Sequence, residues 1–366
     1  MATFHEALKH KNRISPVLLK RAGVMAVGVG YVDPLKPSLG ASVIVYTHHK
    51  IVPSGLNSLK STAAKLGSSV PVRFLPSGTF KSHATTAIKP KAIKITSFRG
   101  RFRPVPGGVS IGKTGPSATG TAGVIVTKNN QLFVLSNNHV LIRNNATAYS
   151  RTVQPGPADG GLPVSSRIGR AYQFVPLRKG HVNYQDSSIS KPLLNRLLTP
   201  RYMRSSGLLI TVPGHLISYP VGMHVVKSGR TSGYVRGTVE ANNADVRVSY
   251  GGSLGTLLFR NQSVIVGNSG PVSLPGDSGS VWLRANDRFA AALNFAGTAD
   301  GRRSISNPIA RVMDSYGIRI AVPAAGGSFR KGSVKGTAHI GDQSYVQPLT
   351  ASQRKSNRAI RVRTSN

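Results

Sequence analysis

Short apolar runs recur along most of the chain, and the residues that separate them are mainly Gly, Asn, Asp and Pro. Beyond residue 120 these runs are rich in valine and leucine, and they occupy 122–127, 131–135, 208–212, 223–226, 234–239, 246–250, 264–266, 280–283 and 289–295. Short runs bounded by turn residues at this spacing are typical of an all-β sandwich or barrel. We see no internal repeat.

Two segments of this region have a helical pattern instead. The segment 191–202 (KPLLNRLLTPRY) is predicted to form the one helix in the middle of the β-rich region. The segment 307–317 (NPIARVMDSYG) is predicted to form a C-terminal helix that ends at Gly317, because glycine commonly stops a helix.

The first 85 residues differ from the rest because helical and strand patterns alternate there. One face of a helix over 3–20 would carry the apolar residues Phe4, Ala7, Leu8, Ile14, Val17 and Leu18. Pro16 opposes an unbroken helix and could split it. Valine-rich runs at 23–32 and 41–46 predict two strands, and Ser54 is placed to cap a short helix over 55–66. We therefore predict a small α/β unit over residues 1–85.

Changes in amino-acid composition along the chain indicate the remaining domain boundaries. Residues 86–120 are rich in Lys, Pro, Gly and Ser and are predicted to form a connector. The mainly β domain is predicted to span 121–322. Residues 323–366 are basic, rich in Ser and Gly and without periodicity, so we expect a disordered tail.

The charge balance is strongly positive. The chain has 366 residues, with 48 Lys and Arg against 11 Asp and Glu, which gives a net charge of +37. The excess is spread along the chain and forms no single basic block. A diffuse positive field favours contact with polyanions such as nucleic acid or anionic lipid. A general bias toward basic residues is the alternative explanation.

Several classes of protein are excluded or disfavoured by what the sequence lacks. It has no cysteine, which excludes disulfides and thiolate chemistry. The first 23 residues are charged throughout and do not resemble a signal peptide, and no run of about 18 apolar residues predicts a membrane span. A cytoplasmic location is therefore the default expectation.

One short motif, PGDSGS at 275–280, raises the possibility of nucleophilic catalysis by Ser278. A nucleophilic serine needs a base, an acid that orients the base, and backbone N–H groups for the oxyanion. His139 ends a strongly apolar run, LFVLSNNHVLI, where a structural histidine is the alternative. Asp186 has no Lys or Arg within four residues on either side, so it could be a buried partner of an imidazole or a turn aspartate.

The order and spacing of these three residues distinguish between the alternatives. His139, Asp186 and Ser278 follow one another at intervals of 47 and 92 residues. Chymotrypsin has the same order, with intervals of about 45 and 93. Subtilisins and α/β-hydrolases have other orders.

Together with these residues, the segments RPVPGGVSIG, GTAGVIV, LSNNHVL, QPGPADGG, KSGRTSGYVRGTV, PGDSGSVWL and LNFAGT resemble the chymotrypsin-like serine peptidases. More narrowly, the chain looks like bacterial trypsin-like proteins that carry a small N-terminal unit and are related to the plant narrow-leaf protein. AVGVGYVDP and ASVIVYTHHK resemble that N-terminal unit. The resemblance covers most of the chain and implies a mainly β fold of two antiparallel β-barrels with the site between them.

The resemblance also implies roles for individual residues. His139 would be the general base, Asp186 would orient it, and Ser278 would attack the scissile carbonyl. The N–H groups of Gly276 and Ser278 would form the oxyanion hole. The substrate pocket would be formed by Val272, Phe295, Ala296 and Gly297.

No acid is present in these pocket segments, so we do not expect cleavage after Arg or Lys. A small or medium apolar P1 residue, or an acidic one helped by nearby cations, fits better. Digestive members of the family activate by freeing an N-terminus that pairs with the aspartate beside the nucleophile. About 100 residues precede the barrels here without a clear activation site, so Asp277 needs another partner or must stay solvated, and we expect no such cleavage.

Two other functions remain open at the level of sequence. One is a protease-fold binding protein whose cleft is blocked by the tail or the N-terminal unit. The other is a nucleic-acid-binding protein, although aromatic residues make up only 6% and no binding motif is visible. We expect no metal and no cofactor, since Asp159 reads as a turn residue and His48–His49 are a poor chelate. A peptide or protein substrate is the expected partner, and a homo-oligomer is compatible with the sequence.

Overall fold

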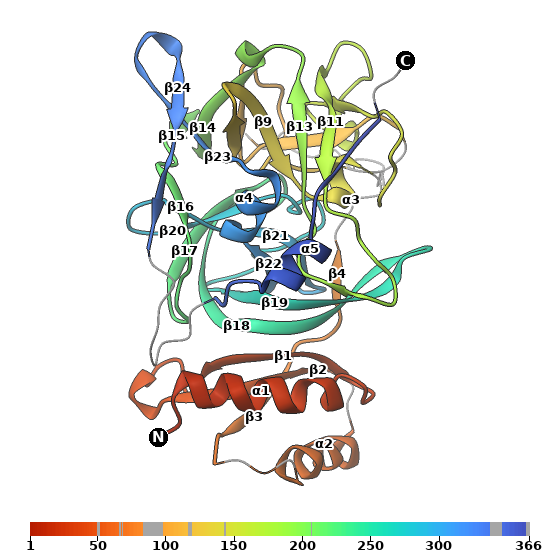
Figure 1. Cartoon of the computed structure of the whole chain (residues 1–366), viewed down its shortest axis with the longest axis vertical. Helices are drawn as coiled ribbons and strands as arrows, with labels where there is room; N and C mark the ends of the chain where they lie inside the picture. The colour runs from red at the N-terminus through yellow and green to blue at the C-terminus, as the bar shows by residue number, and fades with distance from the viewer. Residues whose placement is uncertain are drawn as a thin grey trace.

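A computed structural model describes residues 1–49, 52–65, 67, 69–82, 98–115, 119–142, 144–205, 207–336 and 346–363 (Figure 1). Strands hold far more of these residues than helices do, which confirms the predicted mainly β class. None of the described helices is both long enough and apolar enough to cross a membrane.

A closed antiparallel barrel forms the centre of the molecule. Pairing runs from β17 through β18, β19, β22, β21 and β20 and back to β17. The bounds of these strands are β17 His224–Gly229, β18 Gly233–Gly251, β19 Gly255–Gly267, β20 Val281–Arg284, β21 Ala290–Thr298 and β22 Arg303–Pro308. Several of the predicted apolar runs lie in these strands, where Trp282 of β20 and Ile265 of β19 are fully buried. Helix α4, Ile309–Tyr316, follows β22 and ends at Gly317 in the left-handed conformation, as predicted.

A second sheet packs around a separate apolar cluster that includes Ile111, Val134 and Phe174. Its strand order is β24-β23-β8-β9-β13-β11-β10-β6-β7, and β26, which is not part of this series, also pairs with β11. The bounds are β6 Ser110–Lys113, β7 Thr119–Thr121, β8 Ile125–Lys128, β9 Gln131–Ser136, β10 Arg151–Val153, β11 Arg167–Phe174, β13 Ser188–Pro192, β23 Arg319–Pro323, β24 Phe329–Lys331 and β26 Ile360–Arg361. The short helix α3, Asn138–Leu141, follows β9.

Shorter elements join these sheets. Strands β5 Val105–Gly107, β14 Leu198–Ser205 and β15 Leu208–Ile210 form a three-stranded sheet. Strand β12, Val182–Asn183, pairs with β19, and β16, Gly214–Leu216, pairs with β21 and with β25, Ser333–Lys335. Helix α5 spans Ala351–Ser356, and single 3-10 turns lie at Pro37–Leu39, Pro157–Asp159, Asn195–Leu197 and Ala325–Gly327.

The N-terminal residues form the predicted α/β arrangement, with α1 Phe4–Leu18, β1 Val24–Tyr31, β2 Ala41–Thr47, α2 Pro53–Lys65 and β3 Val72–Pro76. Strand β1 pairs directly with β18, so the sheet of this unit continues that of the barrel (Figure 1). Helix α1 runs unbroken through Pro16. Its buried face includes Lys11 and Ser15, which bind Asp245 of β18, while Val17 is exposed, contrary to the predicted apolar face.

Strand β4, Phe80–Ser82, links the N-terminal unit to the barrel. It lies between β18, to which it is parallel, and β21, to which it is antiparallel (Figure 1). Residues 83–97, which comprise the end of the predicted N-terminal unit and the first part of the predicted connector, lie outside the described residues.

Three sequence predictions are corrected by the structure. The segment 191–202 is not a helix but the end of β13, a 3-10 turn and the start of β14, because Pro192 and Pro200 cannot donate the bonds that a helix interior needs. The described part of the predicted connector contains β5 of the three-stranded sheet and β6 and the start of β7 of the second sheet. The predicted disordered tail over 323–366 forms β24, β25, α5 and β26 in its described parts, since these segments pair with β23, β16 and β11, distant in sequence.

Candidate active site

The three candidate catalytic residues come from both sheets. His139 lies on α3, directly after β9 of the second sheet. Asp186 precedes β13 of the same sheet, and Ser278 lies in the turn that leads into β20 of the barrel. All three are buried. His139 and Asp186 are in contact, whereas no hydrogen bond among the described residues joins Ser278 to either of them.

Asp186 is held by a dense set of donors. Its Oδ2 atom lies 2.5 Å from Nδ1 of His139, and its Oδ1 atom accepts from the backbone N–H of Asn138 at 2.7 Å. Its backbone carbonyl accepts from the side-chain amides of Asn137 and Asn307 at 2.7 and 3.1 Å. This arrangement fixes both the carboxylate and the chain that carries it, so the Asp186 carboxylate can orient the imidazole.

Tyr250 is a further member of this cluster that the sequence did not indicate. Its hydroxyl donates to Oδ2 of Asp186 at 2.6 Å, and its ring packs edge-on against the ring of His139 at 5.8 Å between centroids. Burial and the neighbouring Asp186 charge raise the pKa of Tyr250 well above its usual value, so the hydroxyl stays protonated and donates. Tyr250 is 64 residues from Asp186 at the end of a strand, where no local pattern marks it.

Ser278 has no hydrogen bond to the imidazole among the described residues. Its Oγ atom donates to the carbonyl oxygen of Phe295 at 3.3 Å. Among the described residues, Nε2 of His139 is a buried atom that has no hydrogen-bond partner.

The turn around Ser278 requires glycine at two positions. Gly276 and Gly279 have φ angles of +100° and +93°. A Cβ atom at Gly279 would also collide with Ser136 and with the carbonyl of Thr121. Within the described part of the chain, the amides of Gly276 and Ser278 donate to no protein acceptor. Two free amides beside a serine could bind an oxyanion.

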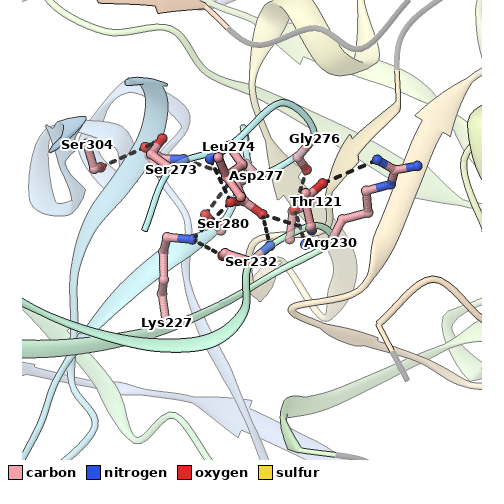
Figure 2. A network of polar contacts seen from close by, with 12 residues as sticks. Thr121, Lys227, Arg230, Ser232, Ser273, Leu274, Gly276, Asp277, Ser280 and Ser304 are labelled. Carbon is pink, nitrogen blue, oxygen red and sulfur yellow. Dashed lines mark hydrogen bonds and ion pairs between the residues drawn. The ribbon is translucent and has the colours of Figure 1, made fainter. Parts of the chain in front are cut away.

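The sequence did not identify a partner for Asp277. In the structure Asp277 is fully buried, and its side chain lies in a network of backbone amides and a lysine (Figure 2). Its Oδ1 atom accepts from the N–H groups of Thr231 and Ser232 at 2.9 and 3.0 Å, and Oδ2 accepts from Leu274 at 2.9 Å. Nζ of Lys227 lies 3.8 Å from Oδ2. Burial lowers the pKa of Lys227, and Asp277 opposes that effect. Asp277 thus has partners within the uncleaved chain.

The four residues predicted to form a substrate pocket do not all lie together. Val272 packs with Trp282 in one apolar cluster, whereas Phe295 and Ala296 pack with Phe80 in another. Near Gly297 the structure places Ser273 instead, a residue that the sequence did not indicate. Ser273 donates to Asn294 Oδ1 and to the Ala296 carbonyl at 3.1 and 3.2 Å.

Asp159, considered above as a metal ligand or a turn residue, makes structural contacts. Asp159 lies in a 3-10 turn and forms a bidentate ion pair with Arg230, at 2.7 Å to Nε and 2.5 Å to Nη2, and it accepts from Ser110. In the described ranges, no three His, Asp or Glu residues gather in a way that could hold a metal ion.

Comparisons with known proteins place the chain near solved serine proteases in fold. A glutamic-acid-specific serine protease, reported to use a histidine triad in substrate binding, is 20% identical over 59% of this chain and all of its own, with a TM-score of 0.43. Thermobifida fusca protease A is 19% identical over 62% of this chain and 99% of its own, with a TM-score of 0.43. Cellulomonas bogoriensis chymotrypsin is 22% identical over 59% and 97%, with a TM-score of 0.42. No protein-family profile and no curated protein sequence matches the chain. At these values the similarity carries no information on activity or specificity.

Proposed function

We propose that the protein is a serine endopeptidase in which His139, Asp186 and Ser278 form the catalytic triad. The observation that carries this proposal is the buried carboxylate of Asp186 at 2.5 Å from Nδ1 of His139, with Nε2 of the same ring left without a partner. A histidine oriented in this way is available as a base toward Ser278.

In the proposed reaction, the Ser278 hydroxyl turns from the Phe295 carbonyl toward Nε2 of His139 and gives up its proton as Oγ attacks the peptide carbonyl. Asp186 stabilises the imidazolium that forms. The free amides of Gly276 and Ser278 bind the oxyanion, and loss of one such donor costs on the order of 3 kcal/mol in the transition state. His139 then protonates the leaving amine, and water hydrolyses the acyl-enzyme by the same steps in reverse order.

The contacts of Asp277 support activity without a freed N-terminus. The three amides and Lys227 provide the polar partners that a new N-terminal amine would otherwise supply. We therefore infer that the uncleaved chain has its oxyanion turn already formed. Loss of all activity from the full-length chain, with recovery on clipping near residue 120, would contradict this inference.

The substrate is proposed to be a peptide or protein whose P1 residue is neither Arg nor Lys. Phe295 and Ala296 lie in one buried apolar cluster, and neither carries a carboxylate. A basic P1 side chain would therefore enter this region unpaired, at considerable cost.

The test is covalent labelling with a fluorophosphonate probe. We expect the wild type to be labelled and Ser278→Ala not to be. Ser263→Ala is the matched control, because Ser263 is a buried serine whose hydroxyl contacts Tyr219 and Asn242 away from the site. Hydrolysis of fluorescent casein by the same three proteins should follow the labelling.

The second candidate is a protease-fold binding protein. It is favoured by the Ser278 hydroxyl, which donates to Phe295 and not to His139. A wild-type protein that is folded but is not labelled by the probe would support this candidate and overturn the first.

A further inference from the structure

Helix α4 and the C-terminal segment around α5, both labelled in Figure 1, border a cavity of about 360 Å³. This volume is within the range of sites that bind small molecules. The apolar wall of the cavity is formed by Ile217, Pro308, Ala310, Val346, Pro348 and Leu349. His139, Asp186 and Ser278 are not among the residues around it, so the cavity is separate from the candidate active site.

Arg311 of α4 borders this cavity as a buried cation. It is 7% exposed, and no carboxylate in the described part of the chain forms an ion pair with it. Its Nη1 atom donates to the carbonyls of Tyr184 and Asn261 at 2.8 and 3.1 Å, whereas Nε and Nη2 have no hydrogen-bond partner among the described residues. Burial lowers the pKa of Arg311 to about 10. Because buried charges in proteins are normally paired, this guanidinium calls for an anion.

The other charged residues around the cavity also favour an anionic ligand. Arg354 and Arg358 border it together with Asp314, so that with Arg311 there are three cations and one carboxylate. A positive site attracts anions, and the apolar wall favours a ligand with an aliphatic body. The Asp314 charge disfavours a phosphate, which carries more negative charge than a carboxylate. The chemistry that fits best is therefore a small aliphatic carboxylate.

We propose that this cavity binds a small aliphatic carboxylate, whose charge compensates that of Arg311. A guanidinium pairs with a carboxylate through two N–H groups on one of its edges. Nε and Nη2 of Arg311 form such an edge and have no acceptor among the described residues. The inference does not rest on the proposed function, because the groups that would bind the ligand are separate from His139, Asp186 and Ser278.

Hydrogen bonds link the cavity to the segment that carries Asp186. Ser315 borders the cavity, and its Oγ atom accepts from the side-chain amides of Gln185 and Asn357 at 2.9 and 3.2 Å. Gln185 directly precedes Asp186, and Asn357 directly follows α5. A ligand in the cavity therefore contacts elements that are brought together only in the folded chain, so its binding should stabilise the fold.

The test is isothermal titration calorimetry of the full-length chain with octanoate. Two compounds of the same chain length serve as controls: 1-octanol, which has no charge, and octylammonium, which has the opposite charge. We expect octanoate to bind at least about tenfold more tightly than either, because only octanoate makes charge-assisted hydrogen bonds with a guanidinium. Equal affinity for octanoate and 1-octanol, or no binding of octanoate, would overturn the inference.

Because the net charge of the chain is +37, a variant must distinguish the cavity from the rest of the surface. Ala310→Leu adds volume to the cavity wall on α4 and changes no charge. Ala351→Leu is the matched control, since Ala351 is exposed on α5 and does not border the cavity. We expect Ala310→Leu to weaken octanoate binding at least about tenfold and Ala351→Leu to keep the wild-type affinity. Wild-type affinity in Ala310→Leu would place octanoate elsewhere and overturn the inference.

Arg311→Met tests the role of the buried charge. Methionine keeps an unbranched apolar side chain without the guanidinium, and an apolar residue of similar volume commonly replaces a buried charge without loss of the fold. Thermal unfolding is followed with and without octanoate, since a ligand of the folded state raises the unfolding temperature. We expect octanoate to stabilise the wild type and not Arg311→Met, and equal stabilisation would overturn the assignment. The comparison of Ala310→Leu with Ala351→Leu does not depend on how Arg311→Met folds.

The carboxylate could be that of a free aliphatic acid or that at the C-terminus of a peptide, since both share this chemistry. The dipeptide N-acetyl-Leu-Leu represents the second source, and its C-terminal amide is the uncharged control. Tighter binding of octanoate than of the dipeptide would assign a free acid to the cavity, and the reverse order would assign a peptide end. Equal affinity for the dipeptide and its amide, together with equal affinity for octanoate and 1-octanol, would reject both sources and the site.

Discussion

Replacement of Tyr250 by phenylalanine is the sharpest test of how the candidate triad is oriented. Tyr250→Phe removes one hydroxyl and keeps the ring that packs against His139. The hydroxyl is one of three donors to the Asp186 carboxylate, at 2.6 Å, beside His139 Nδ1 at 2.5 Å and the Asn138 amide at 2.7 Å. Its loss leaves His139 as the sole donor to Oδ2 of Asp186 among the described residues.

The size of the effect follows from these contacts. A hydrogen bond to a charged group contributes about 1.5–3 kcal/mol. If the whole loss appeared in the transition state, the rate of reaction at Ser278 would fall by about 10- to 150-fold. Asn137 and Asn307 still hold the backbone of Asp186. We therefore expect the lower end of this range, a fall of about 10- to 30-fold.

The assay is the second-order rate of fluorophosphonate labelling, with thermal unfolding measured in parallel. Tyr316→Phe is the matched control, since Tyr316 is also buried and its hydroxyl bonds to Ser187, beside Asp186 in sequence but not to its carboxylate. The control should label at the wild-type rate even if its stability falls. Wild-type labelling by Tyr250→Phe, or equal slowing in both variants, would refute the assigned role.

Two further predictions concern buried charge. Asp277→Asn should lower the free energy of unfolding, measured by urea denaturation, by about 3–5 kcal/mol, because it leaves Lys227 buried without its counter-charge. Adding Lys227→Met should restore part of this loss, and a loss below about 1 kcal/mol in Asp277→Asn would contradict the pairing. Burial, with a smaller contribution from Arg319, lowers the pKa of His215 from 6.5 to about 4. As the pH falls, the unfolded chain therefore takes up the His215 proton before the folded chain does. The free energy of unfolding should fall by up to about 3 kcal/mol as the pH drops from 6.5 to 4. In urea titrations at several pH values, His215→Phe should reduce this dependence of stability on pH, whereas His224→Phe, at an exposed position, should leave it unchanged.

The parts of the fold that depend on local pattern were predictable from the sequence. Helix α1, strands β1 and β2, and helix α4 with its stop at Gly317 all lie where apolar spacing and glycine indicated. The order and spacing of His139 and Asp186 in the sequence also suggested a pair, and the structure places the two side chains in contact.

The parts that depend on distant partners were not predictable. The segment 329–335 and residues 360–361 have no periodicity, yet they form strands because β23, β16 and β11 offer open edges to them. Strand β4 is too short to show an alternating pattern, and its pairing with β21 spans more than 200 residues of sequence. Tyr250 likewise meets Asp186 only through the closure of the long β18–β19 hairpin.

That hairpin connects the three features on which function would depend. Strand β18 pairs with β1 of the N-terminal unit through Asn242–Val246, with β4 through Val248 and Ser249, and then reaches the Asp186 carboxylate through Tyr250. Removal of the N-terminal unit would therefore expose the edge of β18 and remove β4 from the edge of β21 in one step. A change in activity after such a deletion could come from the exposed edge of β21 or from a displaced Tyr250. Only variants that act on β4 alone, such as Lys81→Pro, separate exposure of β21 from displacement of Tyr250.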